Sequence, residues 1–284
     1  MGLGGWARRL VTASTTPGAE PSVEPVYRTI VSTCMGIFRL RNWDVRVTGG
    51  EHVPAAGPAV IATNHIGYVD FIFVGAAVHF THPGRLVRFA AKQETFDHAV
   101  SGPLMRAMKH IPVDRTGNAT ASIDHAVELL EQGELVGMFP EATVSQSFVP
   151  LPGKTGTVRM AQRAGVPIVP GAVWGSHRLF PKGRPRDLRK DVVITVDFGA
   201  PLTPGPDDDP QTVTDQLMTS ITELVDRAQR RYPQPPGPDE DPWWLPRHLG
   251  GTAPTPEEAR AAALERRERF RQEREARQRQ AGGS

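Results

Sequence analysis

Cysteine and long apolar runs are what this chain has least of. Its only cysteine among 284 residues is Cys34, so an internal disulfide is excluded, and this fits a reducing compartment. No segment offers the ~20 consecutive apolar residues that a membrane-spanning helix needs. The formal net charge of +2 is too small to indicate binding to nucleic acid. Any contact with a membrane is therefore expected to be peripheral.

The N-terminus and the histidines exclude further classes of protein. After Arg8 and Arg9 the chain continues with Ser, Thr, Pro and Gly rather than with an apolar run, so no secretory signal is indicated. Trp6 stands where N-myristoylation requires Ser or Thr. We expect no metal site, because zinc-type spacing is lacking among the scattered residues His52, His65, His79 and His82.

The composition that remains is that of an ordinary globular protein, with 39% hydrophobic and 23% charged residues. We divide the chain into four parts. Residues 1–24, rich in Gly, Ser, Thr and Pro, are expected to be mobile. Residues 25–43 are expected to form an amphipathic, membrane-associating helix, and residues 44–231 the main domain. Residues 232–284 are expected to be a Pro-rich segment followed by a charged tail, either helical or disordered.

The first helical pattern combines an apolar stripe with basic and aromatic flanks. The flanks are Arg28, Arg39 and Arg41, with Trp43 just beyond. Such a helix suits a lipid headgroup layer, and a first helix packed on the domain is an equally good interpretation. The stripe recurs at spacings of three and four through Val26, Ile30, Cys34, Ile37 and Phe38.

From residue 44 onward, short β-type runs alternate with helical patterns. The runs fall at 45–47, 59–62, 86–89, 135–139, 166–173 and 192–198. Helical patterns cover 119–132 and 154–164, and each stops at a glycine, Gly133 and Gly165. This alternation predicts an α/β fold with a mostly parallel central sheet flanked by helices.

The C-terminal part begins with a further amphipathic helix, capped by Asp209 with Pro210 at its first position. In the Pro-rich segment after it, Trp243-Trp244-Leu245 either fills a groove on the domain or touches lipid. Thr255 and Glu258 form a capping box that starts a C-terminal helical tail without a lasting apolar stripe.

The strongest local signal is the segment Asn64 to Asp70, which reads NHIGYVD and lies between two apolar runs. His65 and Asp70 do not share a helix face, but they meet if His65 leaves the strand in a loop and Asp70 opens the next helix. Asp70 would then bind one ring nitrogen of His65 and leave the other as a proton acceptor. This is the His–Asp half of a hydrolytic triad without a serine nearby, so an acceptor alcohol would be the nucleophile. A structural histidine that caps a turn is the alternative.

Two downstream segments place polar residues at the ends of apolar runs. In IPVDR, Arg115 could grip a phosphate with its planar fork of donors, or pair with Asp114 on the surface. In FPEAT, Glu141 follows a strand, where ligands commonly bind in open α/β sheets. The run VPIVP at 166–170 either lines an acyl channel or is buried core, as apolar strands usually are, and we assign it no catalytic role.

The order NHIGYVD, IPVDR, FPEAT and VPIVP resembles the four motifs of the glycerolipid acyltransferase family, over roughly residues 59–174. The resemblance implies that residues 44–231 are an acyltransferase domain with His65 as general base, supported by Asp70. It implies a substrate-binding set with a phosphate grip and a cleft-ordering or glycerol-holding glutamate. That set comprises Lys92, Arg115, Glu141, Thr143 and Lys154.

The third motif departs from the family pattern Phe-Pro-Glu-Gly-Thr-Arg-Ser. Ala142 replaces the glycine and Val144 replaces the arginine. Because that arginine is associated with the acceptor phosphate, the departure concerns which acceptor is used.

The expected function is transfer of a fatty acyl group from acyl-CoA or an acyl-carrier protein to the free hydroxyl of a lysophospholipid. The first-choice acceptor is 1-acyl-sn-glycerol-3-phosphate, at the cytoplasmic face of the cell membrane and without a cofactor. The alternatives are a transacylase or acyltransferase on another lysolipid, a lipid hydrolase or thioesterase, and a peripheral lipid-binding protein without activity. Retention of both His65 and Asp70 favours an enzyme.

Overall fold

The described strands form one seven-stranded sheet in the order β1-β7-β6-β2-β5-β3-β4. All neighbouring strands are parallel except β6 and β7, so the predicted mostly parallel α/β sheet is confirmed. The computed structural model describes residues 24–99, 101–113 and 119–281, so nearly all of the segment 1–24 lies outside the described residues. The strands are β1 Asp44–Thr48, β2 Ala59–Thr63, β3 Val87–Lys92, β4 Ile111–Val113, β5 Leu135–Met138, β6 Ile168–Trp174 and β7 Val193–Phe198.

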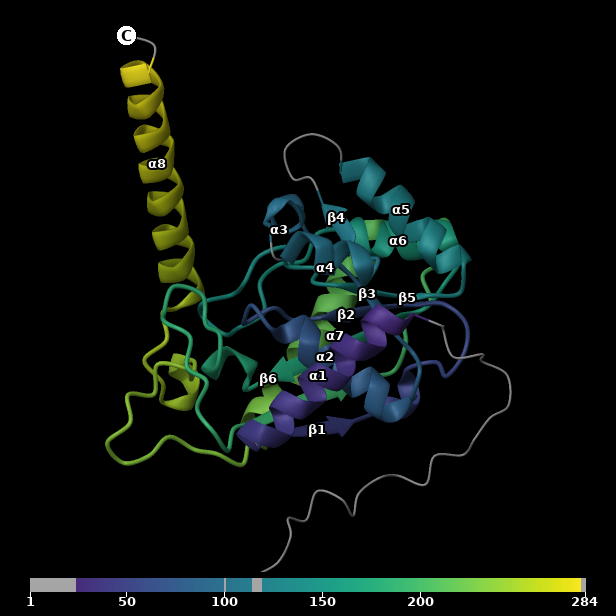
Figure 1. Ribbon diagram of the computed structural model, residues 1–284, viewed down its shortest axis with the longest axis horizontal. Helices are drawn as coiled ribbons and strands as arrows, with labels where there is room; N and C mark the ends of the chain where they lie inside the picture. Colours follow the sequence, from purple (N-terminus) through teal and green to yellow (C-terminus); the bar gives the residue numbers. More distant parts are fainter. Residues whose placement is uncertain (1–23, 100, 114–118, 282–284) are drawn as a thin grey trace, which may run out of the picture.

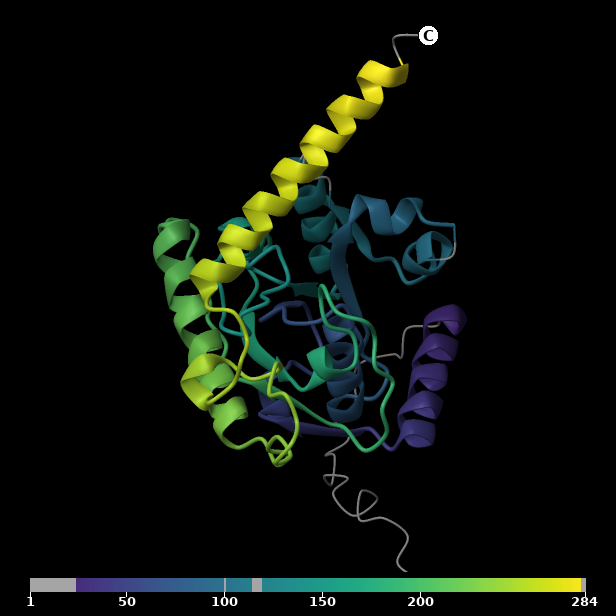
Figure 2. The same cartoon turned by 90° about the vertical axis from the view of Figure 1, so that its left-hand side faces the viewer.

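Helices cover both faces of this sheet (Figure 1). α1 and α7 lie on opposite sides of it (Figure 2). The helices are α1 Pro25–Arg41, α2 Asp70–Thr81, α3 Gln93–Asp97, α4 Ser101–Ala107, α5 Ala119–Glu131, α6 Gly156–Ala164, α7 Pro210–Arg230 and α8 Pro256–Ala281, with the 3-10 turns η2 Gly50–His52, η3 Ser176–Arg178 and η4 Arg247–Leu249.

The central strand β2 is buried along its whole length and divides two apolar cores. Ala59 and Ile61 belong to the core on the α2 side, whereas Val60 and Ala62 belong to the core beneath α5, α6 and α7. Successive side chains of a strand point to opposite faces, so a strand with helices on both sides is apolar throughout.

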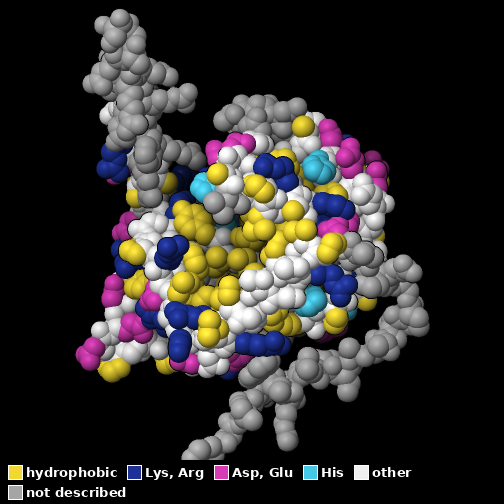
Figure 3. Space-filling view, viewed as in Figure 1, with side chains coloured by type: hydrophobic (Ala, Val, Ile, Leu, Met, Phe, Trp, Pro, Cys, Tyr) yellow, Lys and Arg dark blue, Asp and Glu magenta, His cyan; other side chains and the backbone are white. Residues whose placement is uncertain are grey.

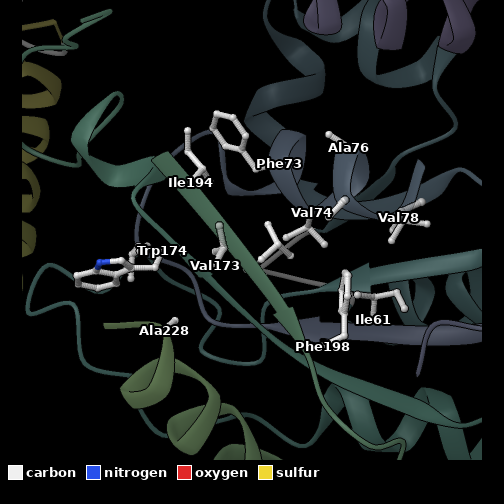
Figure 4. Close-up of a cluster of buried hydrophobic side chains, with 14 of the residues drawn as sticks. Ile61, Phe73, Val74, Ala76, Val78, Val173, Trp174, Ile194, Phe198 and Ala228 are labelled. Carbon is white, nitrogen blue, oxygen red and sulfur yellow. The ribbon is translucent and has the colours of Figure 1, made fainter. Parts of the chain in front are cut away.

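α2 is the buried helix of the first core, which explains its apolar composition on all sides. Figure 4 shows Phe73, Val74 and Val78 of this helix in a cluster with Ile61 and Val173 from the sheet. Burying such side chains stabilises the fold by roughly 1.5–3 kcal/mol each. This packing fixes where the first residue of α2, Asp70, stands.

α7 follows the pattern expected of it. Asp209 caps the helix by accepting a hydrogen bond from the backbone N–H of Thr212 at 2.8 Å, and Pro210 opens the first turn. The buried face that packs on the sheet consists of Val213, Thr214, Leu217, Ile221, Leu224, Val225, Ala228 and Gln229.

α1 packs on the domain but keeps an apolar edge exposed. Phe38 is buried and stacks on Phe73 with ring centroids 5.1 Å apart. Val26, Ile37 and Leu40 remain 48%, 43% and 75% exposed. The expected apolar stripe is therefore divided between the core and the surface, because the core takes only the side of the helix that faces α2.

Part of the segment after residue 231 packs on the domain. Trp244 is 1% exposed, Leu245 and Ala253 join the same core, and Trp243 packs against it partly buried, so the tryptophan pair contacts the domain. α8 then projects from the domain (Figures 1 and 2). Its capping box forms as predicted, with the Glu258 N–H donating to Thr255 Oγ1 at 3.2 Å and the Thr255 N–H to Glu258 Oε2 at 3.0 Å.

Among the helices that the structure describes, none combines the length and the apolar composition that crossing a bilayer demands.

Candidate active site

The loop that follows β2 is anchored to the neighbouring strand before it reaches the candidate catalytic residues. The buried Asn64 donates from Nδ2 to the carbonyl of Val173 at 3.1 Å, and its Oδ1 accepts from the N–H of Val173 at 2.7 Å. A side-chain amide thus continues the pairing of β2 with β6. His65 leaves the sheet from this anchored position.

His65 and Asp70 meet as their spacing predicted. Nδ1 of His65 lies 2.9 Å from Oδ2 of Asp70, the residue that opens α2. The same oxygen accepts the backbone N–H groups of Ile66 at 2.7 Å and Gly67 at 2.8 Å. Because Oδ2 of Asp70 accepts all three hydrogen bonds, the proton of the neutral His65 ring must lie on Nδ1. Nε2 of His65 is then free of a proton and can accept one.

The imidazole of His65 is held from its face as well as from its edge. Its ring stacks on Phe139 with centroids 4.1 Å apart and planes 16° from parallel. The His65 side chain keeps 19% of its surface exposed, while that of Asp70 is fully buried. The site therefore presents a partly accessible base on a buried carboxylate.

A side chain at Gly67 would crowd this loop. A Cβ there would stand 3.1 Å from Cα of His177 and 3.2 Å from Oδ1 of Asp70. The next residue, Tyr68, donates its N–H to the carbonyl of Phe180 at 3.1 Å. The loop is thus clamped against the segment that follows β6.

Glu141 is a buried brace of this loop. Glu141 is only 4% exposed. Its Oε1 accepts a hydrogen bond from the N–H of His65 at 2.8 Å, and its Oε2 accepts one from the N–H of Leu151 at 2.9 Å. Burial raises the pKa of Glu141 to about 8, against the effect of the two N–H donors, which favour the charged form. Of the two roles that the resemblance implied, this geometry corresponds to ordering the cleft.

We call His65 and Asp70 the dyad, and the residues that join them the dyad loop. The rest of the third motif runs along this loop. The N–H of Ser145 donates to the carbonyl of His65 at 2.7 Å. Ala142 has a φ of 53°, in the left-handed region that favours glycine. Val144 is buried, with 7% exposure. The hydroxyl of Thr143 lies 3.4 Å from Nζ of Lys182, a cation that the motif comparison did not indicate.

Two of the remaining candidates, Lys92 and Lys154, lie at the same edge of the sheet, where the carboxyl ends of parallel strands meet. Lys92 is exposed at the end of β3 and pairs in register with Val113 of β4. Arg115 lies outside the described residues, two positions after that strand. Lys154 is exposed, and its backbone N–H donates to the carbonyl of Pro140 at 2.9 Å.

One contact of the dyad was not indicated by the sequence. The hydroxyl of Ser176 donates to Oδ1 of Asp70 at 2.5 Å. The two residues are 106 positions apart, so no local pattern connects them. A Gly-Ser pair directly after a buried strand is the only local signal at this position.

Comparison with known proteins identifies the family of this chain. A family model described as Acyltransferase matches residues 44–174. A 1-acyl-sn-glycerol-3-phosphate acyltransferase of Bacillus subtilis is 33% identical over 176 residues, which cover 61% of this chain and 85% of that protein. One of Limnanthes douglasii is 32% identical over 161 residues, but the match covers only 54% of its length and 56% of this chain.

A solved structure has the same fold. The crystal structure of the 1-acyl-sn-glycerophosphate (LPA) acyltransferase PlsC of Thermotoga maritima matches with a TM-score of 0.60 at 21% sequence identity, covering 73% of this chain and 81% of that one. The motifs, the fold and the relatives agree: this chain is an acyltransferase and belongs to the PlsC-type glycerolipid acyltransferase family.

Proposed function

We propose that this acyltransferase moves a fatty acyl group from acyl-CoA or an acyl-carrier protein to the free hydroxyl of a lysophospholipid, with 1-acyl-sn-glycerol-3-phosphate as its acceptor. The observation that carries the proposal is the His65–Asp70 pair, which orients an imidazole as a base. The names of the Bacillus subtilis and Limnanthes douglasii relatives support the choice of acceptor.

The neighbouring hydroxyls support direct transfer without an acyl-enzyme. Ser176 donates its proton to Asp70, and Oγ of Ser145 donates to the carbonyl of Val149 at 2.7 Å. Neither serine is therefore oriented as a nucleophile toward Nε2 of His65. This supports the hydroxyl of the acceptor lipid as the nucleophile.

The proposed reaction is a single displacement. Nε2 of His65 takes the proton of the acceptor hydroxyl, and the oxygen of that hydroxyl attacks the thioester carbonyl carbon. The ester C–O bond forms and the thioester C–S bond breaks. The imidazolium, stabilised by the Asp70 carboxylate, returns its proton to the leaving thiolate. No group of the protein is left modified.

The acceptor phosphate needs cations, and we assign this role to Lys92, Arg115 and Lys154. Lys92 and Lys154 are exposed at the carboxyl edge of the sheet, and Arg115 is two positions after β4 in the sequence. The buried Val144 supplies no charge. Charged hydrogen bonds from such groups stabilise a bound phosphate by roughly 1.5–3 kcal/mol each. Glu141 and Thr143 complete the site as cleft-ordering residues.

We further propose that the enzyme works as a peripheral protein at the cytoplasmic face of the cell membrane. The apolar edge of α1 ends beside Arg39, and Tyr68, inside the dyad loop, is 56% exposed. Figure 3 shows hydrophobic side chains gathered around a hollow on the face seen in Figure 1, with Lys and Arg side chains around it. A surface of this composition suits the boundary between headgroups and acyl chains.

The test is a product assay with purified protein, labelled oleoyl- or palmitoyl-CoA, and a panel of lysolipids with and without phosphate. We expect labelled phosphatidic acid from 1-acyl-sn-glycerol-3-phosphate. A parallel arm with acyl-carrier protein thioesters decides the donor. Release of free fatty acid without acceptor would identify a hydrolase, and product formation without any thioester would identify a transacylase. Either result would overturn the proposal.

A further inference from the structure

The Asp70 carboxylate is held on both of its oxygens, but by different parts of the chain. Oδ2 takes its hydrogen bonds from the dyad loop itself, at His65, Ile66 and Gly67. Oδ1 is the oxygen that Ser176 contacts, from the turn η3 behind β6. Ser176 and Asp70 are both fully buried, so bulk water does not replace this bond freely.

The backbone of this turn is built to place the serine. Gly175, just before it, has a φ of 95°, and a Cβ there would lie 2.3 Å from the carbonyl oxygen of Val193. Only glycine fits both the conformation and the space. The turn therefore leaves β6 in one direction, toward the N-terminus of α2.

The two residues after Ser176 fasten the turn to the C-terminal segment. Nε2 of the fully buried His177 lies 2.9 Å from the carbonyl oxygen of Trp244; burial lowers the pKa of His177 to about 4, so the neutral ring donates. Arg178 donates to the Tyr232 hydroxyl at 3.2 Å and to Oε1 of Gln234 at 3.1 Å. Its guanidinium also lies over the Trp244 ring, 4.3 Å from the centroid.

A carboxylate bound on one oxygen only could rotate about its terminal torsion, which has a broad minimum. The Ser176 bond to Oδ1 opposes this rotation and keeps Oδ2 aligned with Nδ1 of His65. Partners of this kind, one contact away from the reacting group, typically change activity 10–100-fold when removed, as known for the supporting residues of metal ligands.

We propose that Ser176 is a positioning residue of the His65–Asp70 dyad, held in place by the C-terminal segment of residues 232–253 through the turn η3. The inference rests on the proposed catalytic role of the dyad. Ser176 lies beyond the matched family region, which ends at residue 174. It touches Asp70 and not the reacting atoms, so its effect passes through the orientation of His65.

The first test separates the hydrogen bond from the packing. Ser176→Ala removes the hydroxyl, and Ser176→Cys keeps a side chain of similar shape with a weak donor. We expect both variants to lower kcat by about 10–100-fold, with the KM of donor and acceptor within about twofold of wild type. Thr214→Val is the matched control, because Thr214 is also fully buried and donates its hydroxyl to Pro210 O in α7, away from the dyad. Its kcat should stay at the wild-type value.

The second test is a double-mutant cycle with Asp70→Asn. If Ser176 acts through Asp70, Ser176→Ala in the Asp70→Asn background should change kcat by less than about threefold, because the carboxylate that it positions is gone. Full additivity of the two losses, or near-wild-type kcat in both Ser176 variants, would overturn the inference. His65→Ala is run beside them. If it stays active, the proposed dyad itself is wrong; if it is inactive while both Ser176 variants are active, only the positioning role fails.

Discussion

Asp70 shows how one side chain joins local structure to the proposed chemistry. It opens α2 and accepts hydrogen bonds from His65, Ile66, Gly67 and Ser176. A carboxylate with all four donors in place has a fixed orientation, and a general base aligned in this way contributes typically 10²–10⁴-fold to rate.

Replacing the base gives the first prediction. His65→Ala should lower kcat by about 10²–10⁴-fold while leaving donor binding close to wild type. The lost stacking on Phe139 should lower the melting temperature only modestly, because the ring is partly exposed. Asp70→Asn should be similarly severe through the wrong tautomer of His65. Steady-state assays and calorimetry measure both. His248→Ala, an exposed histidine of η4, is the control. Near-wild-type turnover in His65→Ala would refute the mechanism.

Ala142 gives a prediction about stability alone. Its φ of 53° is a left-handed conformation that costs a non-glycine residue roughly 1–2 kcal/mol. Ala142→Gly should therefore raise the free energy of unfolding by about 0.5–1 kcal/mol after the greater entropy of the unfolded glycine chain is subtracted. Ala121→Gly, an exposed position inside α5, should lower it by about 0.5–1 kcal/mol. Equal effects of the two changes in denaturant titrations would contradict this account.

At the scale of elements, the sequence predicted the features that depend on neighbouring residues, such as where helices begin and end. Asp209 and Pro210 marked the start of α7, and Gly165 the end of α6. The His65–Asp70 contact followed from a strand, a loop and a helix in succession. The Ser176 contact and the short helices α3 and α4 were not predicted, and the burial of Trp244 was one of two alternatives left open. The Ser176 contact and the Trp244 packing depend on residues far apart in the chain, and the helices are too short for a periodic pattern.

α1 is the element for which sequence left two interpretations, and the structure contains both a packed side and an exposed edge. Changing Val26, Ile37 and Leu40 together to serine should weaken binding to anionic vesicles and lower activity on bilayer substrate. It should leave activity on a short-chain, water-soluble acceptor near wild type, because the packed side is untouched. Vesicle co-sedimentation and the two assays measure this. Leu264→Ser, an equally exposed leucine of α8, is the control. Equal losses on both acceptors would contradict a membrane role.

At the scale of the whole molecule, the buried cation of Arg88 connects segments that are far apart in the sequence. Arg88 of β3 is fully buried and donates to Glu24 at the start of α1 at 2.8 and 2.9 Å, and to Glu134 before β5 at 2.9 Å. Lys109 adds a bond to Glu24 at 2.7 Å. These contacts fix the N-terminal end of α1 to the sheet. The candidate site lies at the other edge of the sheet, at the carboxyl ends of the parallel strands.

The pH dependence of this network gives the last prediction. Burial by itself would raise the pKa of Glu24, but hydrogen bonds and charge from Lys109 and Arg88 outweigh it and hold the pKa below its usual 4.5. A carboxyl with a lowered folded-state pKa stabilises the fold above its unfolded pKa, and this contribution is lost as the pH falls through the folded value. Arg88→Met removes a cation from both Glu24 and Glu134, while Lys109 remains beside Glu24.

We expect Arg88→Met to lower the free energy of unfolding at pH 7 by about 2–4 kcal/mol, toward the low end for a broken buried pair because water reaches both carboxylates. As the pH falls from 7 toward 4, the difference from wild type should begin to shrink, because Glu24 becomes protonated and no longer needs the cation. Urea titrations at both values measure this. Arg46→Met, which removes a surface pair with Asp44, should cost no more than about 1 kcal/mol at either pH. An Arg88→Met loss that is the same at pH 7 and pH 4 would mean that Arg88 acts through packing against Tyr27 and not through its charge, and α1 would then be held by apolar contact alone.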